Sequence, residues 1–151
     1  MANHVRQQIR DAVAVMLGGL SLTGSRVFKN RLQRLDEADL PCLLISTDNE
    51  QISPQTFGIN AVLERDLTLT IKAIVQDSVT YADDIDTVIK DVEQVISLNI
   101  TNNTLAGLVK TIRLQSIEFN DDGQGEQPIA EATMNFSVSY YTLANTPDSS
   151  I

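Results

Sequence analysis

The most regular pattern in the chain is an alternation of apolar and polar residues from Ile59 to Gln76. Every odd position except Arg65 carries an aliphatic side chain, and most even positions are polar. A second alternation, from Ile129 to Leu143, places its apolar residues on the even positions. A period of two is typical of a strand that buries one face and exposes the other. The sequence therefore predicts two long strands of this kind.

Two other segments have apolar residues at spacings of three and four, which predicts amphipathic helices over 5–20 and 80–98. Gly18 and Gly19 are expected to end the first helix. Thr80 is expected to cap the second, and acidic residues follow it, near the positive end of the helix dipole: Asp83, Asp84 and Asp86.

Pro41 is suited to the first residue of a strand, because it lacks an N–H donor and forces the preceding residue toward extended geometry. The apolar run that follows predicts a strand over 42–47, and the Asp, Asn, Ser, Pro and Gly residues of 48–58 predict a loop. Residues 25–35 alternate poorly and are expected to form an edge strand or an extended arm.

Residues 110–119 predict a strand that forms a hairpin with 129–143. Their apolar positions change parity between Leu114 and Ile117, which indicates a β-bulge. Together these elements predict an α/β (α+β) protein of one domain, 1–151, in the order α-β-β-β-α-β-β. We expect a single mixed, mostly antiparallel sheet packed against two main helices, with residues 144–151 as a flexible tail.

Charge narrows the classes of partner. The 151 residues include 11 basic and 20 acidic ones, a formal net charge of −9, so sequence-specific nucleic-acid binding lacks its electrostatic basis. A negative field still suits a protein past which DNA must move without adhering. No stretch has the roughly 20 apolar residues of a membrane helix, so we expect no membrane association.

The residues that usually carry catalysis are sparse. His4 is the one histidine and precedes the first helix in a segment expected to fray, and Cys42 is expected to be a small buried hydrophobic residue. Neither the Cys and His inventory nor the acidic clusters has the spacing of a metal site. We therefore expect no catalytic residue, no cofactor and no metal, and a protein that is not an enzyme.

Two segments carry a resemblance to a known family. The acidic turn and proline-started strand "LDEADLPCLLI" and the last long strand "ATMNFSVSYYT" occur in an order of elements similar to that of tail terminator (tail completion) proteins of long-tailed, lambda-like bacteriophages. The resemblance covers roughly residues 3 to 143 by element order.

This resemblance implies a structural protein of the virion, made in the host cytoplasm. It implies a hexameric ring at the head-proximal end of the tail that stops polymerisation of the tail tube and presents an interface for head joining. The implied partners are other copies of the chain, the tail tube protein and a neck or head-completion protein, with DNA passing through the ring lumen.

A ring requires heterologous contacts between neighbouring subunits. We expect a basic arm to meet acidic loops across them, and the candidate interface residues are Arg26, Lys29, Arg31, Arg34, Asp121, Asp122 and Glu126. Two alternatives stay open. One is a neck or head-completion connector, and the other is a small non-enzymatic α/β ligand-binding or regulatory domain.

Overall fold

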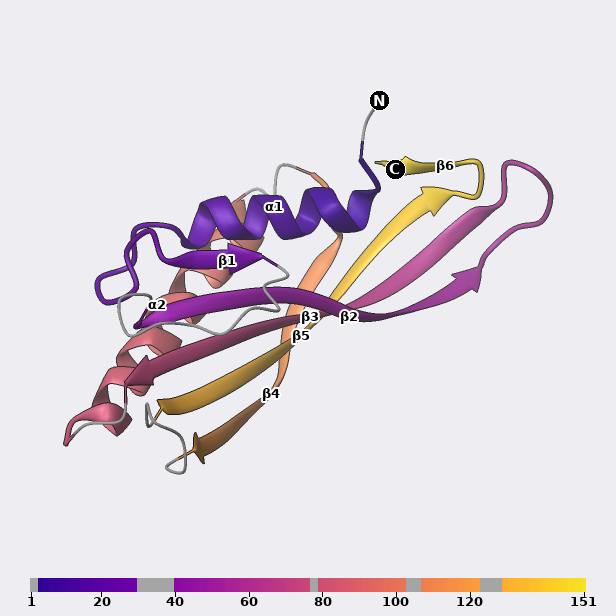
Figure 1. Ribbon diagram of the computed structural model, residues 1–151. Coiled ribbons are helices and arrows are strands. Elements are labelled where there is room, and N and C mark those ends of the chain that lie inside the picture. Colours follow the sequence, from indigo (N-terminus) through magenta and orange to yellow (C-terminus); the bar gives the residue numbers. More distant parts are fainter. Residues whose placement is uncertain (1–2, 30–39, 77–78, 103–106, 123–128) are drawn as a thin grey trace.

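A computed structural model of the protein describes residues 3–29, 40–76, 79–102, 107–122 and 129–151 (Figure 1). Within these residues the chain forms two helices and six strands. In chain order they are α1 (Val5–Leu17), β1 (Val27–Lys29), β2 (Cys42–Pro54), β3 (Val62–Gln76), α2 (Tyr81–Asn102), β4 (Thr111–Asp122), β5 (Ile129–Leu143) and β6 (Thr146–Ser150). The predicted α+β class and the predicted order α-β-β-β-α-β-β are confirmed as far as β5.

The strands form one sheet in the order β1-β2-β3-β5-β4, and β6 pairs with the end of β5. The short β1 runs parallel to β2, while β2, β3, β5, β4 and β6 pair in antiparallel fashion. The sheet is therefore mixed and mostly antiparallel, as the alternation of the long strands and their hairpin predict.

One face of the sheet packs against both helices and forms the core. The predicted alternation is present in both long strands: the odd positions of β3 from Arg65 onward and the even positions of β5 are buried, although Thr70 and Ile74 on the other face of β3 are buried as well. They form one cluster with the apolar stripe of α1 and the inward residues of α2. Burial of this common apolar surface is the main stabilising term of the fold.

The bulge expected in β4 is confirmed. The register of β4 against β5 shifts between Leu114 and Ser116, so Ile112 and Ile117 both lie on the helix-facing side of the sheet. A second bulge, between Thr47 and Asn49, interrupts the pairing of β2 with β3. An extra residue in one strand of a pair reverses the faces of all residues that follow it.

The loop expected over 48–58 is largely wrong, because β2 continues to Pro54 and pairs with the first half of β3. In this part of β2 the residues are mostly exposed, so apolar alternation, the signal that predicts strands, is missing. Pro54 is tolerated at the end of the strand, where its missing N–H breaks no ladder.

The flexible tail expected over 144–151 is also replaced by structure, since residues 146–150 form β6. The N–H of Ile151 donates to the carbonyl of Tyr141 at 3.0 Å. The hydroxyl of Ser150 donates to the carbonyl of Leu108 at 2.8 Å. Backbone pairing therefore orders a segment whose side chains are polar.

Glycine ends α1, as predicted, although three residues earlier than the apolar stripe suggests. The N–H of Gly18 donates to the carbonyl of Val15 at 3.2 Å, and Gly19 turns the chain at a φ of 95°. Helix α2 carries Asp83 and Asp84 in its first turn, where negative charge stabilises the N-terminal end of a helix.

Candidate functional site

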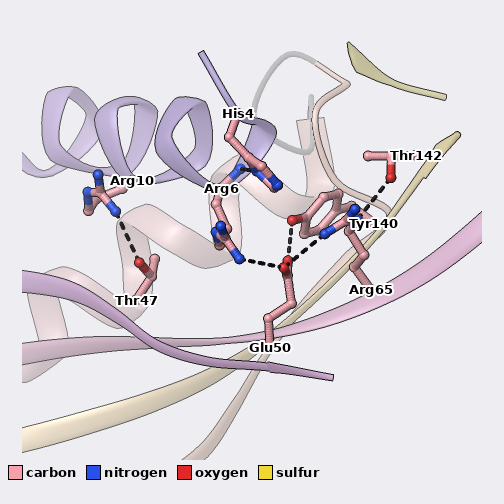
Figure 2. Close-up of polar contacts among 8 residues, drawn as sticks. All are labelled: His4, Arg6, Arg10, Thr47, Glu50, Arg65, Tyr140 and Thr142. Atoms are coloured by element: carbon pink, nitrogen blue, oxygen red, sulfur yellow. Dashed lines mark hydrogen bonds and ion pairs between the residues drawn. The ribbon is translucent and has the colours of Figure 1, made fainter. Parts of the chain in front are cut away.

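A carboxylate lies buried between the sheet and the N-terminus of α1. The side chain of Glu50, on β2, is 5% exposed, and its Oε2 accepts from Arg6 Nη1 at 2.9 Å and from Arg65 Nη1 at 3.1 Å. Arg65 comes from β3 and is 8% exposed, whereas Arg6 comes from α1 and reaches solvent (Figure 2). One acid therefore joins a helix to two strands.

The second oxygen of Glu50 is also occupied. The hydroxyl of Tyr140, on β5, donates to Oε1, and Arg65 Nε donates to Thr142 Oγ1 at 2.9 Å (Figure 2). Burial, and then the hydrogen bond to Glu50, raise the pKa of Tyr140 well above its ordinary value, so this phenol stays protonated. We call Arg6, Glu50, Arg65 and Tyr140 the ion cluster.

The bulge in β2 makes the ion cluster possible. Before the bulge, odd positions such as Ile45 face the helices, and after it Glu50 takes that face, opposite Leu67. On the next pair of strands Arg65 lies opposite Tyr140. Sheet register therefore brings residues far apart in the chain to the rim of the core.

The histidine expected in a fraying segment instead caps α1. The Nδ1 of His4 accepts a hydrogen bond from the backbone N–H of Arg6 at 3.1 Å. Burial and the positive charges of Arg6 and Arg65 lower the pKa of His4, and the carboxylates of Glu50 and Asp148 oppose this shift. A protonated ring cannot accept at Nδ1, so the cap requires neutral histidine.

We predict that acid weakens the protein through His4. Because the folded-state pKa of His4 lies below the ordinary value of 6.5, the unfolded chain binds the proton first, and stability falls as pH drops below 6.5 toward the folded pKa. Urea midpoints at pH 7.5 and 5.5 measure this loss. The variant His4→Asn keeps a good capping acceptor that does not titrate, so it should lose less. Equal losses in both proteins would contradict the prediction.

Every carboxylate oxygen of Glu50 has a partner within the chain, so the ion cluster has the geometry of an internal brace. It ties the N-terminus of α1 to the root of the β2–β3 hairpin, which projects from one end of the sheet (Figure 1). Neither oxygen of Glu50 is therefore left free to bind a partner.

The face of the sheet opposite the helices is polar, and no described helix or strand covers its middle. It carries a groove of about 610 Å³ lined by residues that include Ser46, Asp48, Thr70, Lys72, Glu118 and Asn135. The hydroxyl of Thr70 donates to Asp48 Oδ2 at 2.5 Å. By register, acidic residues on this face outnumber the basic ones: Asp48, Glu64, Asp66, Glu118 and Glu131 stand against Lys72 and Arg113.

Arg26 and Lys29, of the predicted interface set, form contacts within the chain. Arg26 donates to the carbonyl oxygens of Pro41 and Leu22, at 2.8 and 2.7 Å. Lys29 Nζ lies 2.7 Å from Asp11 Oδ1 in an exposed pair. Their role between subunits stays a prediction.

Of the remaining members of that set, the structure describes the backbone of Asp121 and Asp122. Asp121 and Asp122 are the last residues of β4 and lie opposite Ala130 and Ile129 of β5. Arg31, Arg34 and Glu126 lie outside the described residues, as does the acidic turn 36–39.

The described part of the chain holds no group of three or more His, Cys, Asp or Glu residues placed to bind a metal ion. Neither α1 nor the described part of α2 has the length and apolarity needed to cross a membrane.

No protein-family model matches the chain, and no curated protein matches it. Among solved structures, the fold is similar to a chain in the virion of a native gene transfer agent (GTA) particle. The two chains are 14% identical with a TM-score of 0.41, and the likeness covers 90% of this chain and 92% of that chain.

Sequence reasoning did not predict the ion cluster, although one signal for it was present. Arg65 is the exception in the alternation of β3, a charge at a position that faces the core. A buried arginine requires an anionic partner, so its place in the pattern indicates a buried carboxylate nearby. The pattern does not identify the partner of Arg65. The bulge that turns Glu50 toward the core is not marked by any apolar alternation in β2.

Proposed function

We propose that this protein is a tail terminator, a subunit of a ring at the head-proximal end of a phage tail that stops growth of the tail tube and provides the interface for head joining. The observation that carries the proposal is the order of elements. The resemblance rests on a helix, three strands, a helix and a closing hairpin, and the chain folds in that order. The protein then acts through the geometry of its contacts and not by catalysis.

The charge of the uncovered sheet face supports this function. A ring through which DNA passes must not bind the phosphate backbone, and a surface on which carboxylates outnumber cations repels it. The face with Asp48, Asp66 and Glu118 meets this requirement, and the helices cover the other face. We therefore propose that the uncovered face is turned toward the lumen.

The test is assembly without the protein. Particles made in its absence are expected to carry overlong tails without heads, and supplying the chain in trans should restore tail length. Electron microscopy measures both. Tails of normal length that fail to join heads would instead identify a neck connector, and normal infectious particles would exclude both functions.

The ring itself is tested by native mass spectrometry of the protein with purified tail tubes. We expect a hexamer of 16.6 kDa subunits that forms on the tube ends. A monomer or dimer under all conditions, together with a small molecule bound to the protein, would favour the ligand-binding alternative.

A further inference from the structure

The turn between β2 and β3 is an ordered structure. In residues 55–61, which we call the tip, the N–H of Gln55 donates to the carbonyl of Val62 at 2.7 Å, and Val62 donates back to Thr56 Oγ1 at 2.8 Å. Gly58 adopts a φ of 101°, and Ala144 donates to the carbonyl of Ala61 at 2.8 Å. The turn is held in shape before any partner binds, which lowers the entropic cost of association.

The tip presents two large apolar side chains to solvent. Phe57 is 99% exposed and Ile59 is 77% exposed. Single exposed hydrophobic residues are common on protein surfaces. An aromatic and an aliphatic side chain together on a preformed projecting turn have instead the features of an interface anchor, because such residues supply most of the binding energy when a pocket receives them.

A pocket of suitable chemistry lies where α2 begins. A cavity of about 200 Å³, which we call the notch, is lined by residues that include Ala82, Ile85, Asp86, Phe119, Ala130 and Glu131. Phe119 belongs to the helix-facing side of β4, opposite the buried Ala132, yet it is 65% exposed. The notch thus has an apolar floor, with the acidic residue Asp86 beside it.

The tip and the notch lie at opposite ends of the same sheet (Figure 1). Val62, beside the tip, pairs with Leu143 of β5, whereas Ala130, in the notch, is near the start of that strand. At ~3.3 Å per residue along β5 the two are about 40 Å apart. They cannot meet within one molecule, so contact between them requires two copies.

Charge favours the tip as the segment that enters the notch. Two copies with a net charge of −9 repel each other, and the exposed carboxylate of Asp86 beside the notch disfavours an acidic partner. No charged residue occurs between Gln51 and Leu63. The tip can therefore bury its apolar side chains in the notch without bringing like charges together.

We propose that the tip of each copy docks into the notch of the next, with Phe57 as the anchor. The contact is heterologous, so it joins copies head to tail and closes into a ring if the rotation per subunit allows. The inference rests on the proposed ring and names the surfaces that build it.

The experiment uses one variant for each half of the contact. Phe57→Ser removes the anchor, and Ala82→Trp fills the notch from an exposed helical position. Each variant alone should weaken self-association about 30-fold, measured by analytical ultracentrifugation with and without tail tubes. Val15→Ser, a control at a residue that is 81% exposed on α1, should leave association unchanged.

Mixing the two variants tests the pairing directly. The Phe57→Ser copy keeps its notch and the Ala82→Trp copy keeps its tip, so an equimolar mixture should form one intact contact and stop at a heterodimer in native mass spectrometry. Thermal unfolding of each variant establishes that it folds. Both altered side chains are exposed, so midpoints near that of the wild type are expected.

The remaining outcomes separate the inference from the function. If either variant, Phe57→Ser or Ala82→Trp, assembles like the wild type, the docking of the tip into the notch is wrong. The terminator proposal is unaffected by that result. If the wild type never associates, even with tubes, then docking and ring both fail. Tail length in particles supplied with the wild-type chain remains the separate measure of terminator function.

Discussion

Replacement of Glu50 by alanine is expected to lower the free energy of unfolding by about 3–5 kcal/mol, the usual cost of removing one partner from a buried ion pair. The loss arises because Arg65, with a side chain only 8% exposed, keeps its charge but loses the carboxylate. Tyr140 also loses its acceptor. Urea unfolding of Glu50→Ala at pH 7.5 measures the change.

Two further variants show whether the unpaired charge of Arg65 causes the loss of stability. Glu64→Ala, one residue from Arg65 but on the opposite face, should change stability by no more than about 0.5 kcal/mol. Adding Arg65→Met to Glu50→Ala should recover part of the loss, because replacing both members of a buried pair by apolar groups costs little. Arg65→Met alone completes the comparison. If the double variant loses as much unfolding free energy as Glu50→Ala and Arg65→Met lose in sum, this account of the ion cluster is wrong.

Ile71→Ala is expected to cost about 2–5 kcal/mol, the range for truncation of a large aliphatic residue in a packed core. Ile71 is fully buried in the middle of β3, between Ile45 of β2 and Met134 of β5. The cavity left by the substitution therefore lies in the centre of the sheet, where neighbouring strands cannot easily close it.

The same substitution at an exposed site provides the control. Ile59→Ala in the tip removes the same atoms from a side chain that is 77% exposed, and should lower the unfolding free energy by less than about 0.5 kcal/mol. Chemical denaturation of both variants gives the comparison. Similar losses at the two sites would mean that the core does not lie where the structure places it.

Much of the sheet could be predicted because burial on one face leaves a period of two in the sequence. The bounds of β5, Ile129–Leu143, agree with the predicted strand, and the parity change near Leu114 correctly indicated a bulge. The second half of β2 and the strand β6 show no alternation of apolar and polar residues. Their side chains are polar, and backbone pairing with β3 and β5 orders them.

The ion cluster could not be predicted as a unit for a related reason. Hydrophobic periodicity gives the face on which Arg65 lies, but not the residue opposite it. Glu50 reaches that position because of an irregularity in register, and Arg6 arrives from α1 through tertiary packing. Long-range pairs of this kind become visible only once the strands are aligned.

The bulge in β2 also limits where the chain can tolerate insertions and deletions. Adding or removing one residue between Ile45 and Glu50 would turn the carboxylate to the polar face and leave Arg65 unpaired, so this stretch can change length only by two residues at a time. Length changes in residues 55–60 fall between the paired residues Pro54 and Leu63, where every side chain is exposed, and leave the buried side chains in place. The fold alone would therefore tolerate indels in that turn, and only the proposed docking of Phe57 restricts them there.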